Sequence, residues 1–180
     1  MKLIFLDFDG VISTFDNKWH ISDEKINHIK NIVDNTNAKL VITSSWKVGY
    51  DNVSDFINNH FNLKNTSDMM MWLKLNIYDI TDNEGPSRGD EIKRYIDSHS
   101  NIETYIIIDD DSDMLDEQLN NFVQTDTYEG ITIREEKICI NLLNYKYVNK
   151  IRLNYENRFK YMYRYYNQEF DDYKLPDLNK

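Results

Sequence analysis

The sequence has little cysteine, proline or glycine. Its 180 residues include one cysteine, two prolines and five glycines. A single cysteine excludes an internal disulfide and a cysteine-rich zinc site, and the apolar neighbours of Cys139 predict a buried thiol. So few prolines and glycines argue against long disordered linkers. We therefore expect one domain, with at most an appendage.

Long apolar runs are also absent. No stretch approaches the roughly 18–20 apolar residues that span a bilayer, and the N-terminal apolar run is too short for a signal peptide. We therefore expect a soluble cytoplasmic protein with no membrane contact. The net charge of −10 argues against a broad nucleic-acid groove, although not against a local one. An apolar content of 41% is sufficient for a packed core.

Two carboxylates follow the first apolar run of the chain. The run from Leu3 to Leu6 predicts a buried strand, and Asp7, Asp9 and Gly10 come directly after it. Like charges this close raise a pKa or require a cation, and glycine allows a sharp turn. The pattern is typical of a metal or substrate site at the carboxyl edge of a sheet, or of a strand that ends in an acidic turn.

Other apolar runs also end in polar clusters. Residues 40–42 predict a strand followed by Thr43 and Ser44, and residues 105–108 predict a strand followed by the acidic segment 109–113. The spacing of apolar residues over 26–33 predicts a helix, which would join the first two strands into a parallel βαβ unit. Because the carboxyl ends of parallel strands share one edge, these clusters are expected to converge.

The remaining elements are less sharply marked in the sequence. We expect helices over residues 53–61, 88–96 and 114–119 and short strands at 77–80 and 122–123.

The acidic segment has a partial calcium-loop pattern. Asp109, Asp111 and Asp113 occupy positions 1, 3 and 5 of such a loop, but Met114 and Asn120 stand where it needs glycine and glutamate. A strand rather than a helix precedes the segment. A magnesium site shared with the first pair of carboxylates fits the sequence better, because Mg²⁺ takes a few carboxylates together with water and phosphate oxygens.

Four motifs resemble, in their order along the chain, those of the haloacid dehalogenase (HAD) superfamily of phosphotransferases. They lie at residues 7–11, 43–44, 88–92 and 108–114. The last two, Arg-Gly-Asp-Glu-Ile and Ile-Asp-Asp-Asp-Ser-Asp-Met, are more specifically similar to the small HAD domains of RNA-repair ("Swiss army knife") proteins. The resemblance covers roughly residues 1–145. It implies an α/β fold: a Rossmann-like three-layer sandwich with a mainly parallel central sheet and a minimal cap.

The resemblance also implies roles for the acidic residues. Asp7 would be the nucleophile that forms an aspartyl-phosphate, and Asp9 the general acid and base. Mg²⁺ would be held by Asp7, the backbone carbonyl of Asp9, and Asp109. Either Asp113 or Asp110 would orient the metal's waters.

The phosphate-binding groups implied by the resemblance come from two other motifs. Ser44, or alternatively Thr43, would donate a hydrogen bond to the phosphoryl oxygens; a simple strand-end turn explains either residue equally well. Arg88 stands where the family usually has lysine and supplies the same charge. Lys93 is the alternative cation, unless it lies on a solvated helix face. The expected substrate-binding residues are Gly10, Ser44, Arg88 and Trp46.

The insertions that cap the site in this superfamily are short here. A helix follows the first strand, and residues 47–87 follow the second. Such a nearly open site resembles that of members acting on exposed macromolecular ends or on small phosphates. Trp19, Trp46 and Tyr50 lie near the predicted mouth, where they either stack on a base or pack in the core.

Residues 146–180 differ in composition from the preceding domain at 1–145. Basic and aromatic residues at helical spacing predict an amphipathic helix, followed by an acidic tail. The apolar stripe is expected to pack on the core or on a second copy of the chain as a homodimer. The alternative is a basic, aromatic clamp for a nucleic-acid strand.

The sequence thus predicts a Mg²⁺-dependent phosphomonoesterase. The expected substrate is a terminal phosphate of RNA or DNA, with the 3′ position favoured, or a free nucleotide. One alternative is a non-catalytic HAD-like module that binds nucleic acid or protein, and another is a calcium-binding structural protein.

Overall fold

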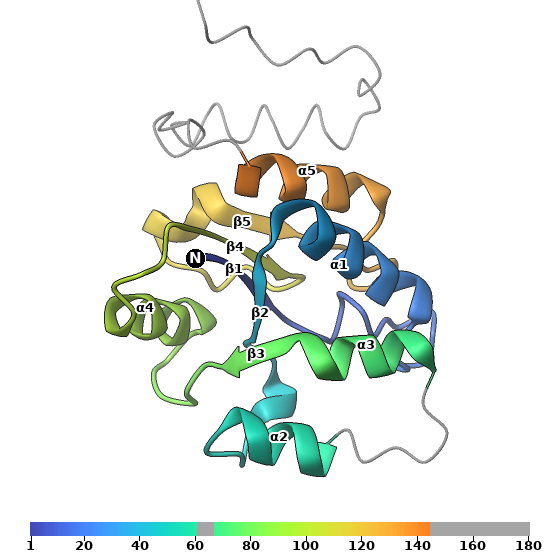
Figure 1. Cartoon of the computed structure of the whole chain (residues 1–180), viewed down its shortest axis with the longest axis horizontal. Coiled ribbons are helices and arrows are strands. Elements are labelled where there is room, and N and C mark those ends of the chain that lie inside the picture. Colours follow the sequence, from blue (N-terminus) through green and yellow to red (C-terminus); the bar gives the residue numbers. More distant parts are fainter. Residues whose placement is uncertain (61–66, 145–180) are drawn as a thin grey trace, which may run out of the picture. The chain divides into compact units, whose positions relative to one another are not determined.

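A computed structural model of the chain describes residues 1–60 and 67–144 (Figure 1). Its strands are β1 (Lys2–Leu6), β2 (Lys39–Ile42), β3 (Ile77–Ile80), β4 (Thr104–Asp109) and β5 (Phe122–Gln124). They form one five-stranded sheet in the order β3-β2-β1-β4-β5, and every pairing is parallel. Because β1 is central, its carboxyl end lies between those of β2 and β4.

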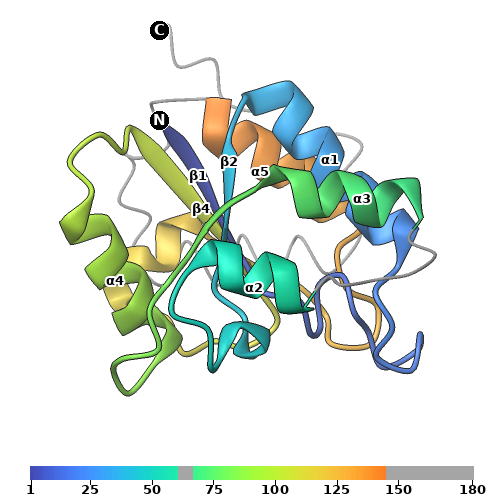
Figure 2. The ribbon, with the colours of Figure 1, turned by 60° about the horizontal axis from the view of Figure 1, so that its bottom comes forward.

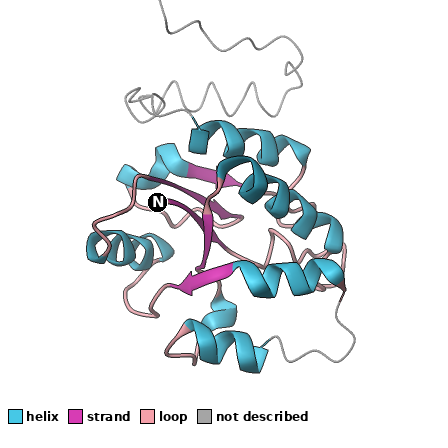
Figure 3. Ribbon diagram, viewed as in Figure 1, coloured by secondary structure: helices cyan, strands magenta, loops and turns pink. Residues whose placement is uncertain are grey.

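Helices cover both faces of this sheet (Figure 3). They are α1 (Asp23–Thr36), α2 (Val53–His60), α3 (Asp68–Asn76), α4 (Arg88–Ser98) and α5 (Ile133–Asn144), with short 3₁₀ turns at Ser45–Lys47 and Asp116–Asn121. One core cluster joins alternate strand residues to α1, α3 and α5, and a second joins the intervening residues to α4. The expected three-layer, Rossmann-like α/β sandwich is confirmed.

The central strand shows why the apolar runs are continuous. Leu3 and Phe5 point into the α4 layer, while Ile4 and Leu6 point into the layer that holds α1 and α5. Successive side chains of a strand face opposite sides, so a strand covered on both faces needs an apolar residue at every position. The run ends at Asp7, where the chain leaves the sheet.

Several predicted elements are found within a few residues of their expected bounds, including β3, α2 and β5. The helix α5 was not anticipated, although Cys139 within it is buried as predicted. The Met-rich segment 69–71 lies in α3, where Met69 and Met70 pack against the core. None of the described helices has both the length and the apolar character needed to cross a membrane. The predicted amphipathic helix and dimer contact at 146–180 lie outside the described residues.

The backbone ladder continues past the carboxyl ends of the strands. The N–H of Asp7 donates to Ile108, that of Thr43 to Leu6, and that of Thr125 to Asp109, each at 3.0 Å. The polar residues that follow β1, β2 and β5 are therefore held in register with the end of β4 at one edge of the sheet, as the parallel arrangement requires. In Figure 2 strands β1, β2 and β4 run side by side toward the end of the sheet nearest α2.

Candidate active site

The carboxylates of Asp7 and Asp109 lie together where β1 and β4 end. Asp7 is 5% exposed and Asp109 is 2% exposed. One oxygen of each, Asp7 Oδ1 and Asp109 Oδ2, is buried and has no hydrogen-bond partner among the described residues. Burying a charge is unfavourable unless it is paired or binds a metal, so these free oxygens identify a place for a cation.

Burial raises the pKa of both carboxyl groups. The pKa of Asp7 rises to about 6, and the charge of Arg88 is the largest influence that opposes the rise. The pKa of Asp109 rises to about 8, first through burial and then through repulsion from Asp7. In the metal-free chain the pair therefore retains a proton near neutral pH, which an added cation would displace.

Arg88 supplies a positive charge directly beside these two carboxylates. It is the first residue of α4, whose N-terminal cap is Ser87. Its guanidinium lies 3.7 Å (Nη2) from Asp7 Oδ1 and 3.5 Å (Nε) from Asp109 Oδ2. These are ion-pair rather than hydrogen-bond distances, so both oxygens keep their capacity to bind another group.

Asp110 brings a third carboxylate to the same place. Its Oδ2 accepts a hydrogen bond from the Thr127 hydroxyl at 2.6 Å. Gly10 allows this approach: it has a φ of +68°, and a Cβ on it would lie 2.1 Å from Asp110 Cγ. Gly10 is therefore needed both for the turn after β1 and for the space that Asp110 occupies.

These three carboxylates fit a hard divalent cation. Asp7, Asp109 and Asp110 each offer an oxygen, and these oxygens lie within 4.8 Å of one another. Mg²⁺ prefers a few carboxylate oxygens and leaves its remaining positions to water or phosphate. The unpartnered oxygens of Asp7 and Asp109 support this fit.

Two of the other predicted groups lie away from this cluster. The Asp113 carboxylate accepts from the Arg88 backbone N–H at 2.8 Å, so it caps the start of α4. Lys93 is exposed and pairs with Asp97 and Glu117 at 3.1 and 3.3 Å. Of the alternatives left open by the sequence, Asp110 and Arg88 lie in the cluster, whereas Asp113 contacts the Arg88 backbone and Lys93 pairs with two exposed acids.

Asp9 is held beside the cluster by two side-chain donors. Its Oδ1 accepts from the Ser13 hydroxyl at 3.2 Å, and its Oδ2 accepts from Trp46 Nε1 at 2.9 Å. The Trp46 ring also meets Phe8 edge to face, with 5.4 Å between the centroids. Trp46 therefore contributes to the site by orienting Asp9, a role that the sequence did not indicate.

Ser44 and Thr43 differ in their contacts, although both are fully buried. A hydrogen bond from the Ser44 side chain helps to hold down the pKa of Asp7. The Ser44 oxygen also accepts from the Trp46 backbone N–H at 3.3 Å. The Thr43 hydroxyl has no partner within the described part of the chain. Ser44 is thus the hydroxyl in contact with the predicted nucleophile.

Sequence reasoning missed a buried lysine behind Arg88. Lys47 is 1% exposed, and its Nζ donates to the Asp82 carbonyl and to Asn83 Oδ1, both at 2.7 Å. It also pairs with Glu91 at 3.1 Å, and Glu91 pairs with Arg88 at 3.5 Å. No spacing pattern marks this lysine, because its burial depends on how the segment before α4 folds over it.

The remaining predicted aromatics are divided between core and surface. Tyr50 packs edge to face on Phe56, with 5.5 Å between the centroids. Trp19 is 44% exposed and lies in the loop between β1 and α1. Packing therefore accounts for Tyr50, whereas Trp19 is available to a ligand.

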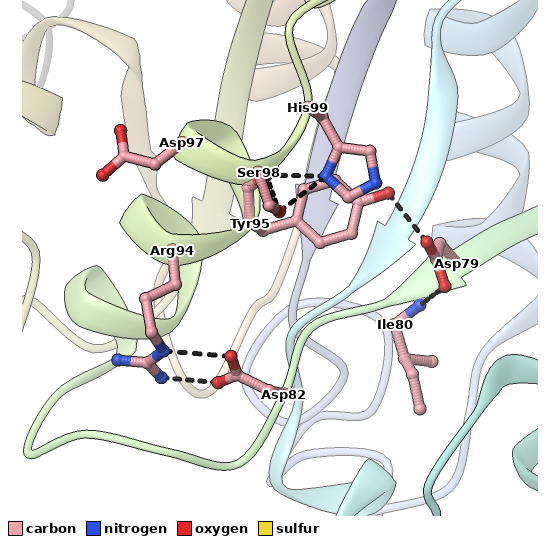
Figure 4. Close-up of a pocket in the computed structure, with 8 residues that line it drawn as sticks. All are labelled: Asp79, Ile80, Asp82, Arg94, Tyr95, Asp97, Ser98 and His99. Atoms are coloured by element: carbon pink, nitrogen blue, oxygen red, sulfur yellow. Dashed lines mark hydrogen bonds and ion pairs between the residues drawn. The ribbon is translucent and has the colours of Figure 1, made fainter.

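A cavity of about 640 Å³ lies apart from the aspartate cluster, between β3 and the second half of α4. Several of its polar side chains bind one another (Figure 4): the Tyr95 hydroxyl donates to Asp79 at 2.9 Å, and Arg94 Nε donates to Asp82 at 2.9 Å. None of the carboxylates of the Asp7 cluster lines it. The cavity is therefore separate from the candidate active site.

Comparison with known proteins gave a match to a family model. A family model described as the HAD domain in Swiss Army Knife RNA repair proteins matches residues 3–135, a range that includes every carboxylate discussed above. Searches of curated proteins and of solved structures returned no match.

Proposed function

The chain belongs to the family of HAD domains found in Swiss Army Knife RNA repair proteins, and on this premise we propose that it is a Mg²⁺-dependent phosphomonoesterase. The proposed substrate is the terminal phosphate of a polynucleotide, the 3′ phosphate ahead of the 5′, with a free nucleotide as the smaller possibility. The observation that carries the proposal is the pair of buried carboxylates, Asp7 and Asp109, whose unpartnered oxygens face Arg88.

Asp7, Asp109 and Asp110 would hold the metal ion. When bound, Mg²⁺ supplies positive charge that neutralises phosphoryl oxygens as they approach a carboxylate. Arg88 adds a fixed positive charge on the α4 side of the same oxygens, and Ser44 adds a hydroxyl donor. These groups favour the ionised form of Asp7, which burial alone disfavours.

Asp7 then acts as the nucleophile. Its carboxylate attacks phosphorus, and the bond between phosphorus and the substrate oxygen breaks to leave an aspartyl-phosphate on Asp7. A carboxylate is a weak nucleophile toward an anionic phosphate, so the surrounding cations are needed for this step.

Asp9 moves the proton in both steps. It gives a proton to the departing oxygen as the first bond breaks. It then takes a proton from the water that attacks the aspartyl-phosphate, which releases inorganic phosphate and restores Asp7. The donors Ser13 and Trp46 fix the orientation of the Asp9 carboxylate for these transfers.

Phosphate release from a substrate panel tests the proposal. The panel contains oligonucleotides with 3′ or 5′ phosphate, free 3′ and 5′ nucleotides, and a simple aryl phosphate, each with and without Mg²⁺. We expect metal-dependent release that Asp7→Asn abolishes while its thermal melt shows a folded chain.

Two results of this panel would contradict the proposal. One is activity retained by Asp7→Asn. The other is no release of phosphate from any substrate by the folded, Mg²⁺-loaded wild type. The second result, combined with tight oligonucleotide binding, would support the non-catalytic binding module instead.

A further inference from the structure

Three exposed aromatic rings from distant parts of the sequence meet on the surface. Phe15, Trp19 and Tyr128 are 55%, 44% and 57% exposed. Phe15 meets Trp19 at 6.1 Å and Tyr128 at 5.0 Å between ring centroids, both edge to face. The Phe15 backbone N–H also donates to the Thr127 carbonyl at 3.4 Å, which joins the two loops. We call these three rings the aromatic cluster.

Both loops of the aromatic cluster are anchored to carboxylates of the active site. Ser13, two residues before Phe15, donates to Asp9. Thr127, the residue before Tyr128, donates to Asp110. Since adjacent Cα atoms are about 3.8 Å apart, the Cα atoms of Phe15 and Tyr128 lie within roughly 8 Å of those of Ser13 and Thr127. Trp19 joins them through its ring contact with Phe15.

The aromatic cluster is connected through Ser13 to Asp9, the residue that would protonate the leaving group. In the proposed mechanism Asp9 protonates the leaving oxygen, so the rest of the substrate extends from the phosphate past Asp9. Phe15 lies two residues after the Ser13 that binds Asp9. A planar group attached near that oxygen would therefore meet the aromatic rings.

The backbone that carries Trp19 adopts an unfavourable conformation. Lys18 and Trp19 have φ angles of 52° and 59°, in the left-handed region that non-glycine residues rarely occupy. The Trp19 N–H donates to the Thr14 carbonyl at 2.9 Å and helps to hold this turn. Strained backbone of this kind is concentrated at functional sites, and here it leaves a large apolar ring exposed to solvent.

Charge indicates which part of a nucleotide the aromatic cluster would bind. The exposed charged neighbours are Asp16, Lys18, Asp126 and Glu129, which do not form a positive surface. A phosphate backbone would need such a surface, whereas a nucleobase needs only a ring to stack on.

We propose that the aromatic cluster stacks the nucleobase attached to the reacting phosphate, so that the enzyme prefers phosphates carried by a nucleoside over simple alkyl phosphates. This inference rests on the proposed function and defines the substrate class of that site. A free nucleotide and a polynucleotide end both carry a phosphate on a nucleoside, so either would present a base to the aromatic cluster.

Kinetics with matched substrates test the inference. We compare kcat/KM for a 3′-phosphorylated oligonucleotide, a free nucleoside 3′-monophosphate and glycerol phosphate, which has no base. Stacking contributes about 1–3 kcal/mol per base, so Trp19→Ala and Tyr128→Ala should each lower kcat/KM for the nucleoside substrates by roughly 5- to 150-fold. The value for glycerol phosphate should not change.

Tyr78→Ala is the matched control. Tyr78 is also an exposed aromatic, but it lies on β3 beneath Lys39, so its removal should affect no substrate. Equal losses on glycerol phosphate and nucleotides, or no loss on either, would overturn the inference. A loss confined to the oligonucleotide would identify a polynucleotide end rather than a free nucleotide as the ligand.

A binding measurement separates failure of this inference from failure of the proposed function. If the wild type releases no phosphate from any substrate, the aromatic cluster is tested by tryptophan fluorescence during titration with an unphosphorylated oligonucleotide. Quenching that disappears in Trp19→Phe supports base stacking without catalysis. Quenching that persists in Trp19→Phe, or no quenching at all, would contradict it.

Discussion

Trp46 and Asp9 are joined by a 2.9 Å hydrogen bond from the indole Nε1 to the carboxylate Oδ2. The two residues are 37 positions apart in the chain. The bond connects the turn after β2 to the turn after β1. It places an aromatic side chain next to the proposed proton donor, and its removal tests that assignment.

Trp46→Phe should reduce phosphatase activity selectively. The phenyl ring can still pack on Phe8, but the donor to Asp9 is lost. Asp9 is neutral when it carries the proton for the leaving oxygen, and a hydrogen bond between neutral groups contributes about 0.5–1.5 kcal/mol, so kcat/KM for an alkyl phosphate should fall roughly 2- to 12-fold. An aryl phosphate should lose less, because its leaving oxygen needs little help from an acid.

Asp9→Asn provides the reference for this prediction. It should lower kcat/KM for the alkyl phosphate by a larger factor, about 10²- to 10⁴-fold, and again lower kcat/KM for the aryl phosphate less. An equal loss on alkyl and aryl phosphates in Trp46→Phe would count against a role through Asp9. Trp72→Phe, on α3 and packed near Lys30, should leave both rates unchanged.

Gly10→Ala should weaken metal binding as well as stability. Its φ of +68° disfavours any side chain, and the new methyl would also collide with the Asp110 carboxylate. Gly49→Ala is the matched control, because Gly49 has a φ of +93° but nothing within 4 Å of a Cβ. Each variant should lose about 1–2 kcal/mol of unfolding free energy from the left-handed backbone, and Gly10→Ala should lose more.

The metal response distinguishes these two glycine variants. Mg²⁺ should raise the melting temperature of Gly49→Ala by as much as it raises that of the wild type. It should raise the melting temperature of Gly10→Ala by less. An identical Mg²⁺ response in both variants would show that Asp110 does not depend on the space at Gly10.

The stability of the metal-free chain should fall as pH rises toward 8. Burial raises the pKa values of Asp7 and Asp109 to about 6 and about 8, from an ordinary value of 3.8. Because the folded state then binds more protons than the unfolded state between about pH 4 and 8, raising the pH favours unfolding. The slope is about 1.4 kcal/mol per pH unit for each proton retained.

Denaturant unfolding with a chelator, compared between wild type and Asp109→Asn, measures this effect. The variant lacks the Asp109 carboxyl, whose pKa is the more strongly raised of the two, so its stability should depend less on pH in this window. Added Mg²⁺ should remove the loss in the wild type, since the ion binds the ionised carboxylates. A wild-type stability that rises from pH 5 to pH 8 without metal would contradict the prediction.

Lys47→Met should destabilise the fold although it removes only one charge. Lys47 is buried against Glu91, the Asp82 carbonyl and Asn83, and these acceptors would be left without its ammonium group. Removal of one partner of a buried ion pair costs about 3–5 kcal/mol. Denaturant unfolding measures the change.

Lys93→Met is the control for the buried lysine. Lys93 also pairs with two acids, but in full solvent, where ion pairs contribute little. We expect no measurable change in its unfolding. Similar behaviour of the two variants would show that burial of Lys47 has no energetic consequence.

Much of the active site could be predicted from the sequence. The strand from Leu3 to Leu6, followed by Asp7 and Asp9, and the strand that ends at Asp109 were visible as apolar runs that stop at acids. Parallel strands place such ends at one edge of the sheet, so the proximity of Asp7 and Asp109 could be predicted without the structure. The resemblance of the ordered motifs to the HAD superfamily added Arg88, and the structure places it beside both carboxylates.

Other relationships were invisible to the sequence because they depend on the direction of side chains after a strand has ended. Asp110 and Asp113 are both acids in one loop, and only the turn beyond β4 directs the first toward Gly10 and the second toward the start of α4. The burial of Lys47 depends in the same way on the path of the chain before α4. Periodicity carries no information about such loops.

The amino-acid sequence by itself determined the α/β class, the parallel order of the first strands and the edge at which the acids gather, because burial on both faces of a sheet requires continuous apolar runs. The tertiary structure alone decided which carboxylates lie close enough to share a cation, how Trp46 contacts Asp9, and that Phe15, Trp19 and Tyr128 meet on loops anchored to Asp9 and Asp110. Those contacts join segments far apart in the chain, and their geometry follows from the packing of loops rather than from any local pattern.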